Sequence, residues 1–394
     1  MMSFEESISI LESLDVKTRG EKLFLSDTLG RVLYGDIIAH ESYPSSPMSA
    51  MDGYAIRFDD IDRYEKLKIS AINPAGSDER FAISEGEAIK TFTGSLMPEG
   101  ADTLVPIEFV SVKDGYIVIN ESISRGYAVR DIGESYMAGE RLIAGGSAIG
   151  YAEIGVMAGL NRVMVDVAQK PRVSIIATGS ELLDIGEPSS HSGEIRSSNS
   201  YTLQALATTY GAEALQMGIV GDSKEMILHR FQSAIESSDI VVSSGGVSVG
   251  DFDFVKDIIP ELGFEVIFKG VNIKPGQHIM LAQKDDKFIV ALPGFAYSST
   301  VTFILYVVPL ISKMLGRKKS YEIIDATLKA PFKKPTKKRE FHACNLTFSD
   351  GRYYVDFDGK KSGTSAILTN MLGDCALMMG EDKNAGEGVR VIKL

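Results

Sequence analysis

Apolar runs alternate with helical patterns along the second half of the chain. In the segment 224–237, Ile227, Phe231 and Ile235 recur every four residues and so share one face of a helix. Strands that alternate with such helices are typical of a mostly parallel sheet covered on both faces. The sequence therefore predicts an α/β domain over residues 171–318 with a doubly wound, mostly parallel central sheet. The expected strands cover 173–177, 215–220, 240–242, 266–268 and 288–292, and the expected helices begin near 199, 224, 253 and 298.

Two other regions show strand patterns without long helices. Residues 47–137 carry short apolar segments separated by Gly, Pro and Asp, which predicts a small β-rich insertion domain. Residues 319–394 alternate in the same way and predict a C-terminal β domain that resembles a barrel. Residues 1–46 and 138–170 are expected to form an N-terminal linking domain. The expected fold class is thus α/β plus β, in several domains.

The N-terminal pattern predicts an amphipathic helix. Phe4, Ile8, Leu11 and Leu14 recur at helical spacing, and acidic residues stand where a secretory signal would be basic. The most apolar stretch, 301–311, is about half the roughly 20 residues that a membrane span requires, and it predicts a buried helix. We therefore expect a cytoplasmic protein without a membrane anchor.

Composition narrows the classes of ligand. The chain has 41 Lys and Arg against 53 Asp and Glu, and a net charge of −12 argues against nucleic-acid binding. Cys344 and Cys375 have neither metal-site spacing nor the number that a disulfide framework needs, which fits a reducing compartment. The five scattered His argue against a structural zinc site. The one basic run, KKPTKKR at 333–339, is expected to be a solvated loop.

The segment SSGGVSVG at 243–250 follows a predicted strand and precedes Asp251 and Asp253. Paired glycines let a backbone approach a ligand, while amides and serine hydroxyls favour a phosphate. Carboxylates at the following helix start suit Mg²⁺ that bridges to phosphate oxygens. The alternative is an ordinary turn between a strand and a helix. No Gly-Lys-Ser/Thr follows, so this is no Walker-A loop.

Three further turns carry candidate chemistry. Glu181, in the turn at 177–182, either caps the next helix or accepts hydrogen bonds from the amino groups of a heterocycle. Lys274 stands on a Pro-Gly turn, which either presents a cation to an oxyanion or is simply exposed. Pro293 and Gly294 end another strand at the sheet edge where ligands bind. These residues predict a polar, phosphate-bearing small molecule as ligand, together with Mg²⁺.

These segments, in this order, resemble the molybdopterin molybdotransferase (MoeA-like) family, which includes the E domain of gephyrin. The similarity spans residues 1–394. Its most specific pieces are SAMDGYA at 49–55, TGSLMPEGAD at 93–102, SSGGVSVGDFD at 243–253, IKPG at 273–276 and ALPG at 291–294.

The resemblance implies an elongated, dimerising subunit with an active site between the two copies. It implies that molybdate is inserted into adenylylated molybdopterin with Mg²⁺ and release of AMP. The expected partners are the molybdopterin adenylyltransferase and client molybdo- or tungstoenzymes. The implied catalytic residues are Asp52, Thr93, Glu181 and Lys274, with Asp52 and Thr93 reaching the site across the dimer. The implied metal residues are Asp222 and Asp253, and the implied molybdopterin or phosphate contacts are Thr178, Gly179, Ser243, Ser244, Gly245, Gly246, Ser248, Gly250, Pro293 and Gly294.

Several positions depart from the family pattern. Phe295 and Ala296 replace the Asn and second Pro of LPGNPxS, and Gln277 replaces the second Lys of IKPGK. Ser180 and Ser135 stand where the family has carboxylates. Each change removes a polar, charged or rigid feature. Two hypotheses follow: a molybdotransferase, including a paralogue specialised for tungstate or one client, or a non-catalytic molybdopterin carrier or scaffold.

Overall fold

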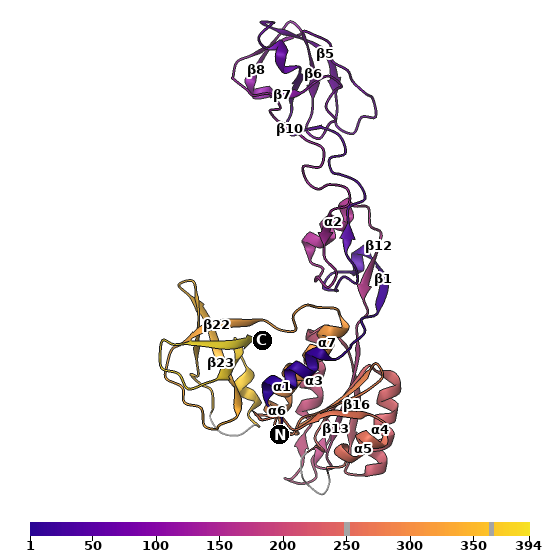
Figure 1. The fold of residues 1–394 in the computed structure, drawn as a ribbon, viewed down its shortest axis with the longest axis vertical. Coiled ribbons are helices and arrows are strands. Elements are labelled where there is room, and N and C mark those ends of the chain that lie inside the picture. The colour runs from indigo at the N-terminus through magenta and orange to yellow at the C-terminus, as the bar shows by residue number, and fades with distance from the viewer. Residues whose placement is uncertain (248–252, 362–365) are drawn as a thin grey trace. The chain divides into compact units, whose positions relative to one another are not determined.

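The chain folds into two compact units in the computed structural model, which describes residues 1–247, 253–361 and 366–394 (Figure 1). Unit 1 comprises Met1–Gly35, Gly145–Tyr151 and Met164–Leu394, and unit 2 comprises Asp36–Ala144 and Ala152–Val163. The predicted insertion at 47–137 falls within unit 2. The finer division into four domains stays a prediction.

Unit 1 is built on a six-stranded mixed sheet. Its strand order is β16 (Glu213–Val220), β13 (Arg172–Thr178), β17 (Ile240–Ser244), β21 (Lys287–Leu292), β20 (Met280–Lys284) and β18 (Glu265–Lys269). Four neighbouring strands pair in parallel, and β20 pairs antiparallel with both β21 and β18, so that β20 alone runs in the opposite direction. The predicted mostly parallel sheet is therefore confirmed, with β20 as a strand that the sequence pattern missed.

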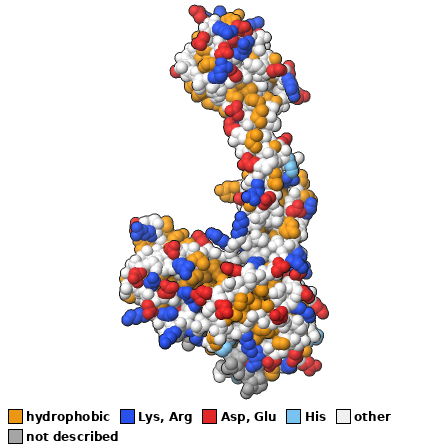
Figure 2. All heavy atoms as spheres, in the orientation of Figure 1, with side chains coloured by type: hydrophobic (Ala, Val, Ile, Leu, Met, Phe, Trp, Pro, Cys, Tyr) orange, Lys and Arg blue, Asp and Glu red, His pale blue; other side chains and the backbone are white. Residues whose placement is uncertain are grey.

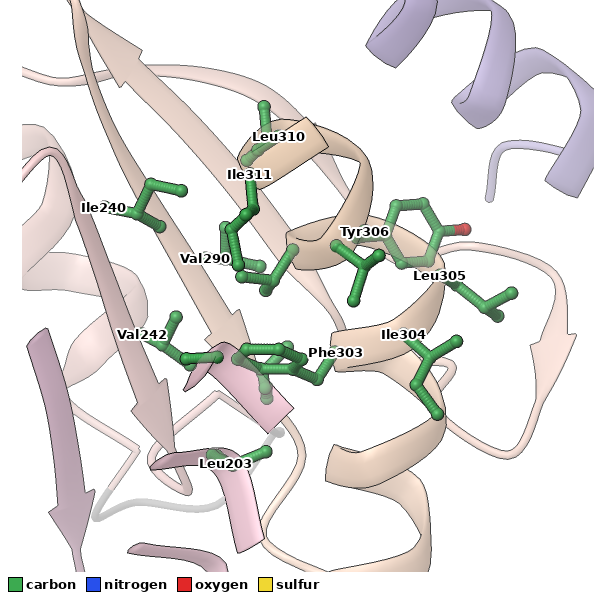
Figure 3. Close-up of a cluster of buried hydrophobic side chains, with 14 of the residues drawn as sticks. Leu203, Ile240, Val242, Val290, Phe303, Ile304, Leu305, Tyr306, Leu310 and Ile311 are labelled. Carbon is green, nitrogen blue, oxygen red and sulfur yellow. The ribbon is translucent and has the colours of Figure 1, made fainter. Parts of the chain in front are cut away.

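Each face of this sheet buries a separate apolar core. Along β17, Ile240 and Val242 pack on one face and Val241 on the other, because side chains alternate along a strand. The first face is covered by α3 (Ser198–Thr209) and by the long helix at 296–314 (Figure 3). The second face is covered by α4 (Lys224–Ser237) and α5 (Val255–Glu261). Helices on both faces confirm the doubly wound arrangement.

The long helix consists of α6 (Ala296–Thr302), a π-helical segment η4 (Phe303–Val307) and α7 (Val308–Met314). Pro309 follows the π-helical segment inside this continuous helix, where it has no N–H to donate to the preceding turn. At 19 residues, the helix is long and apolar enough to cross a membrane, but 83% of it is buried inside the protein. It serves as a core helix, as the pattern at 301–311 predicts.

The C-terminal strands of unit 1 close into a five-stranded barrel, since β23 pairs with both β24 and β25. The remaining pairs join β24 to β22, β22 to β26 and β26 to β25. This confirms the predicted C-terminal β domain. The strands are β22 (Ile323–Leu328), β23 (Arg339–Ser349), β24 (Arg352–Asp356), β25 (Cys375–Gly380) and β26 (Gly388–Lys393), and the short β19 (Ile273–Lys274) pairs in parallel with β23.

The other elements of unit 1 include the predicted N-terminal helix. This helix, α1 (Phe4–Ser13), begins at the cap residue Ser3, whose hydroxyl accepts from the N–H of Glu6. Tyr306 of the core helix is joined to α1 through the Ser7 hydroxyl at 2.9 Å. The short pairs are β1 (Gly20–Phe24) with β12 (Met164–Ala168), and β14 (Leu182–Leu183) with β15 (Ile195–Arg196).

Unit 2 contains a second six-stranded sheet, so the predicted β-rich character is confirmed. Its strand order is β7 (Thr103–Pro106), β4 (Gly53–Ile56), β6 (Glu87–Thr91), β5 (Leu67–Asn73), β9 (Tyr116–Ile119) and β8 (Val110–Lys113). The short pairs are β2 (Ile37–Ile38) with β11 (Arg141–Ile143) and β3 (Met48–Ser49) with β10 (Val129–Arg130), and most of α2 (Tyr151–Gly159) also belongs here.

Charged side chains of both signs are interspersed on the visible face of each unit (Figure 2). The basic run at 333–339 is not fully solvated, because Arg339 forms ion pairs with Glu5 and Glu381. Lys338 of the same run donates to Gln277 Oε1. The expectation of a simple solvated loop is therefore wrong for these two residues, whose partners come from distant parts of the sequence.

The core between α4 and the sheet should depend on Phe231, which is fully buried. We expect Phe231→Ala to lower the free energy of unfolding by about 3 to 5 kcal/mol, because it removes a buried ring and leaves a cavity. Urea unfolding measures this. Met226→Ala on the same helix, where the side chain is 59% exposed, is the control and should change stability by less than about 0.5 kcal/mol. Equal effects of the two substitutions would contradict the assignment.

Candidate functional site

Three loops meet in one cleft of about 850 Å³ at the carboxyl ends of β13, β17 and β21. The predicted residues that line the cleft are Thr178, Gly179, Glu181, Asp222, Ser244, Gly245, Gly246, Asp253, Pro293 and Gly294. Ser248 and Gly250 lie outside the described residues. Carboxyl ends of parallel strands are where ligands bind in such sheets.

Ser243 is the predicted contact that the structure keeps away from the cleft. Its side chain is fully buried, and no hydrogen-bond partner for its Oγ is found among the described residues. Ser244 lines the cleft instead. Since successive side chains of β17 point to opposite faces, only one of the two serines can face the cleft.

The two central glycines are required by close backbone approach. Both have positive φ, +96° at Gly245 and +70° at Gly246. A Cβ on Gly245 would lie 2.7 Å from the carbonyl oxygen of Thr178, and one on Gly246 would lie 2.7 Å from Val255 Cγ2. The loop therefore packs directly on the end of β13 and on α5. The Gly245 N–H also donates to the carbonyl oxygen of Leu292 at 3.1 Å, which joins the loop to the end of β21.

Asn199 at the start of α3 ties two of the loops together. Its Nδ2 donates to Ser244 Oγ at 3.1 Å and to the carbonyl oxygen of Gly294 at 2.8 Å. The side chain is only 9% exposed, so it acts as a fixed brace. Sequence reasoning placed a helix start near Asn199 but gave the residue no role, because its partners lie 45 and 95 residues away along the chain. Arg196 and His278 also line the cleft and carried no sequence signal at all.

Three carboxylates line the cleft, on Glu181, Asp222 and Asp253. Asp222 is held by Ser180, because the Ser180 N–H donates to Asp222 Oδ2 and the Ser180 hydroxyl accepts from the Asp222 N–H, each at 3.0 Å. Over the described residues, no three metal-binding side chains form a preassembled cluster. This donor set suits Mg²⁺, which usually takes one or two carboxylates and completes its shell with substrate phosphate and water.

Lys274 lines a second cleft, of about 380 Å³, beside the barrel. Lys274 belongs to β19, and the pairing of β19 with β23 places this strand and the turn after it against the barrel. Three more lysines line the same cleft, Lys333, Lys360 and Lys361, together with Phe332 and Phe357. Lys274 therefore lies among other lysines, which suits the expected binding of an oxyanion. It lines a different cleft from the one that the glycine loops line.

Unit 2 brings Asp52 and Thr93 together. Asp52 Oδ1 accepts from the Thr93 N–H at 2.8 Å and from the Thr93 hydroxyl at 2.7 Å. These two bonds, the backbone one first, hold the pKa of Asp52 below its usual value. Gly53 beside it is also required, since a Cβ there would lie 2.2 Å from the carbonyl oxygen of Val105. The predicted pair thus forms one exposed, ionised site.

Comparison with known proteins identifies the family. Residues 2–160 match the model of the MoeA N-terminal region (domain I and II), and residues 174–313 match that of a probable molybdopterin binding domain. The chain is 31% identical over 393 residues to the molybdopterin molybdenumtransferase of a Nostoc species, covering 95% of this chain and 90% of the relative. The chain belongs to the MoeA family.

Other relatives agree with this assignment. The Staphylococcus epidermidis molybdopterin molybdenumtransferase is 33% identical over 340 residues, which are 84% of this chain and 81% of the relative. The crystal structure of a molybdopterin biosynthesis MoeA protein from Pyrococcus horikoshii superposes with a TM-score of 0.84 at 26% identity, covering 100% of this chain and 99% of that one. The present MoeA chain is therefore a transferase of molybdenum-cofactor biosynthesis.

The structure shows the contacts of the residues at which this MoeA chain departs from the family pattern. Ser180 braces Asp222, and Gln277 accepts a hydrogen bond from the Lys338 ammonium group. Ser135 accepts from Arg130 at 2.9 Å, beside the Arg130–Glu134 ion pair. Phe295 and Ala296 line the glycine-loop cleft. A cation therefore still stands at the turn where Gln277 replaces Lys.

We expect Asn199→Ala to loosen the cleft, because it leaves Ser244 and the Gly294 carbonyl without their shared donor. The free energy of unfolding should fall by about 1 to 3 kcal/mol. Amide hydrogen exchange should accelerate at residues 244–247 and 294–296 more than in α4. Thr208→Ala, at an exposed position of the same helix, is the matched control. Unchanged exchange at both loops would show that Asn199 does not brace them.

The pKa of Asp52 should depend on Thr93. Its carboxylate stays charged below the usual range, and the two bonds are lost only as the pH falls through that lowered pKa. Thr93→Ala removes the hydroxyl bond and keeps the N–H bond, so the pKa should rise part of the way back. Titration of the carboxyl carbon by NMR measures this. Thr93→Ser retains the hydroxyl and should titrate like the wild type; a rise in that variant would refute the argument.

Proposed function

We propose that this chain inserts molybdate into adenylylated molybdopterin and releases AMP. The observation that carries the proposal is the cleft in which Gly245, Gly246 and Gly294 bring three loops beside the carboxylates of Glu181 and Asp222. Loop amides and small side chains suit a phosphate, and carboxylates suit the amino groups of a pterin or a bound cation. Membership of the MoeA family supports this choice of substrate.

Different residues would bind different parts of the substrates. The Gly246 amide binds phosphate, since the Gly245 N–H already donates to the Leu292 carbonyl oxygen at 3.1 Å, and Glu181 accepts from heterocycle amino groups. Cleavage of the phosphoanhydride places negative charge on the departing adenylate, and N–H donors with nearby cations stabilise such charge as it develops. Lys274 supplies one cation for the molybdate or tungstate oxyanion. Lys338, held at Gln277, supplies the second in place of the family lysine.

Mg²⁺ belongs to this proposal as a bound ion. Asp222 and Asp253 would hold it, with Ser180 fixing the orientation of the first carboxylate. When bound, the ion would offset phosphate charge. The carboxylate pair fits this role better than a closed protein cage, because Mg²⁺ retains water and substrate oxygens among its ligands.

We also propose a cytoplasmic homodimer. Asp52 and Thr93 of one copy would then serve the substrate bound to the other copy, as the family resemblance implies. The ionised state of Asp52, which its bonds from Thr93 favour, suits a carboxylate that orients a donor or a proton on the substrate. A molybdopterin adenylyltransferase would supply the substrate, and molybdo- or tungstoenzymes would receive the product.

Turnover is tested directly by AMP release. Purified protein is incubated with adenylylated molybdopterin and Mg²⁺, with molybdate, with tungstate, or without either anion. We expect AMP release that requires an oxyanion and Mg²⁺, because the oxyanion is the substrate that is inserted and Mg²⁺ stabilises the departing phosphate. Tight pterin binding without anion-dependent AMP would overturn the enzyme assignment and favour the carrier hypothesis.

Asp52→Ala is the matched inactive variant for this assay. Its side chain is exposed, so the fold should remain intact, as circular dichroism and gel filtration can verify. Glu108→Ala provides a surface control in unit 2. AMP release should disappear in the first variant and persist in the second. Wild-type rates in the Asp52 variant would exclude its proposed role.

A further inference from the structure

Phe295 is a large apolar side chain that stands exposed at the end of β21. It lines the glycine-loop cleft, yet 63% of its surface is accessible. Within the described residues, no other aromatic ring or cation is found against it. Its neighbours Gly294 and Ala296 are too small to cover it. An exposed aromatic face at this place is available to a ligand.

The backbone that carries Phe295 is fixed on both sides. As the cap residue of α6, Phe295 accepts at its carbonyl from the Ser299 N–H at 2.9 Å and from the Ser299 hydroxyl at 3.1 Å. The preceding carbonyl, that of Gly294, accepts from the buried Asn199 amide. The ring therefore starts from a rigid helix end, which lowers the entropy lost when a ligand packs on it.

The cleft has a polar part and an apolar part. The loop glycines and the carboxylates of Glu181 and Asp222 form the polar part. Phe295 and the side chain of Ile195, 55% exposed, belong to the apolar part, together with Leu182, Val247 and Pro293. A ligand that matches both has a phosphate for the amides and a flat, nitrogen-rich ring system for the aromatic face.

We propose that Phe295 packs against the pterin ring of the substrate and contributes to its binding specificity. This inference rests on the proposed function and adds one residue to it. The segment 174–313, which includes Phe295, matches a molybdopterin binding domain, so the pterin is favoured over the adenine of the adenylate. The family pattern has an Asn at this position, which can form hydrogen bonds, whereas Phe295 offers ring contact.

The test compares an aromatic with an aliphatic side chain. Phe295→Leu keeps apolar surface but loses the ring, and should raise the KM for adenylylated molybdopterin about two- to tenfold, the range of a single aromatic contact. The kcat should stay unchanged, because such a contact binds substrate and transition state alike. Phe295→Tyr should behave like the wild type. The control is Phe348→Leu on the barrel, where the ring is 65% exposed and outside the cleft.

A spectroscopic measurement separates this inference from the proposed function. The chain contains no Trp, so F295W provides a single tryptophan at the site, which can be excited selectively over the 15 Tyr. Saturation with molybdopterin should shift its emission to shorter wavelength, because the ring loses contact with water, whereas AMP should leave it unchanged. This result can hold even if AMP release fails. An unshifted emission with bound molybdopterin, a shift with AMP, or an unaltered KM in Phe295→Leu would overturn the proposal.

Discussion

The contact of the loop after β17 with the end of β13 is the constraint on which the site depends. Gly245 and Gly246 lie so close to Thr178 and Val255 that a side chain at either position would collide with them. This approach draws the amides of one loop toward the Thr178–Gly179 turn. Asn199 then joins the same loop to Gly294. The cleft is therefore a product of backbone proximity, held by one buried amide side chain.

The sheet beneath the cleft gives this arrangement its rigidity. β17 and β21 are buried on both faces, and their side chains pack in two separate cores. A strand that packs on both sides cannot shift by one residue without reversing every side chain. The positions of Ser243 and Ser244 follow from this constraint, because one must enter the core when the other faces the cleft.

Three residues that depart from the family pattern, Ser180, Gln277 and Phe295, bring new hydrogen-bond partners or a new kind of side chain to their positions. Ser180 exchanges hydrogen bonds with Asp222 and avoids a second carboxylate beside it. Lys338 brings a cation to Gln277 from a distant segment. Phe295 brings a ring to a position where the family pattern has an amide. These three sites lie on unit 1, at the glycine-loop cleft and at the turn after β19, whereas Ser135 lies on unit 2.

Local sequence was sufficient to predict the alternating elements, the C-terminal β domain as a whole, and the glycine loops that line the cleft, because the spacing of apolar side chains reflects the periods of helices and strands. It could not predict strands such as β4 and β20, whose short apolar segments become strands through pairing with neighbours. It also could not assign Lys274 to the second cleft, since that depends on pairing of β19 with β23. The brace at Asn199 and the cation at Gln277 join residues far apart along the chain, and only the folded backbone decides which distant groups meet.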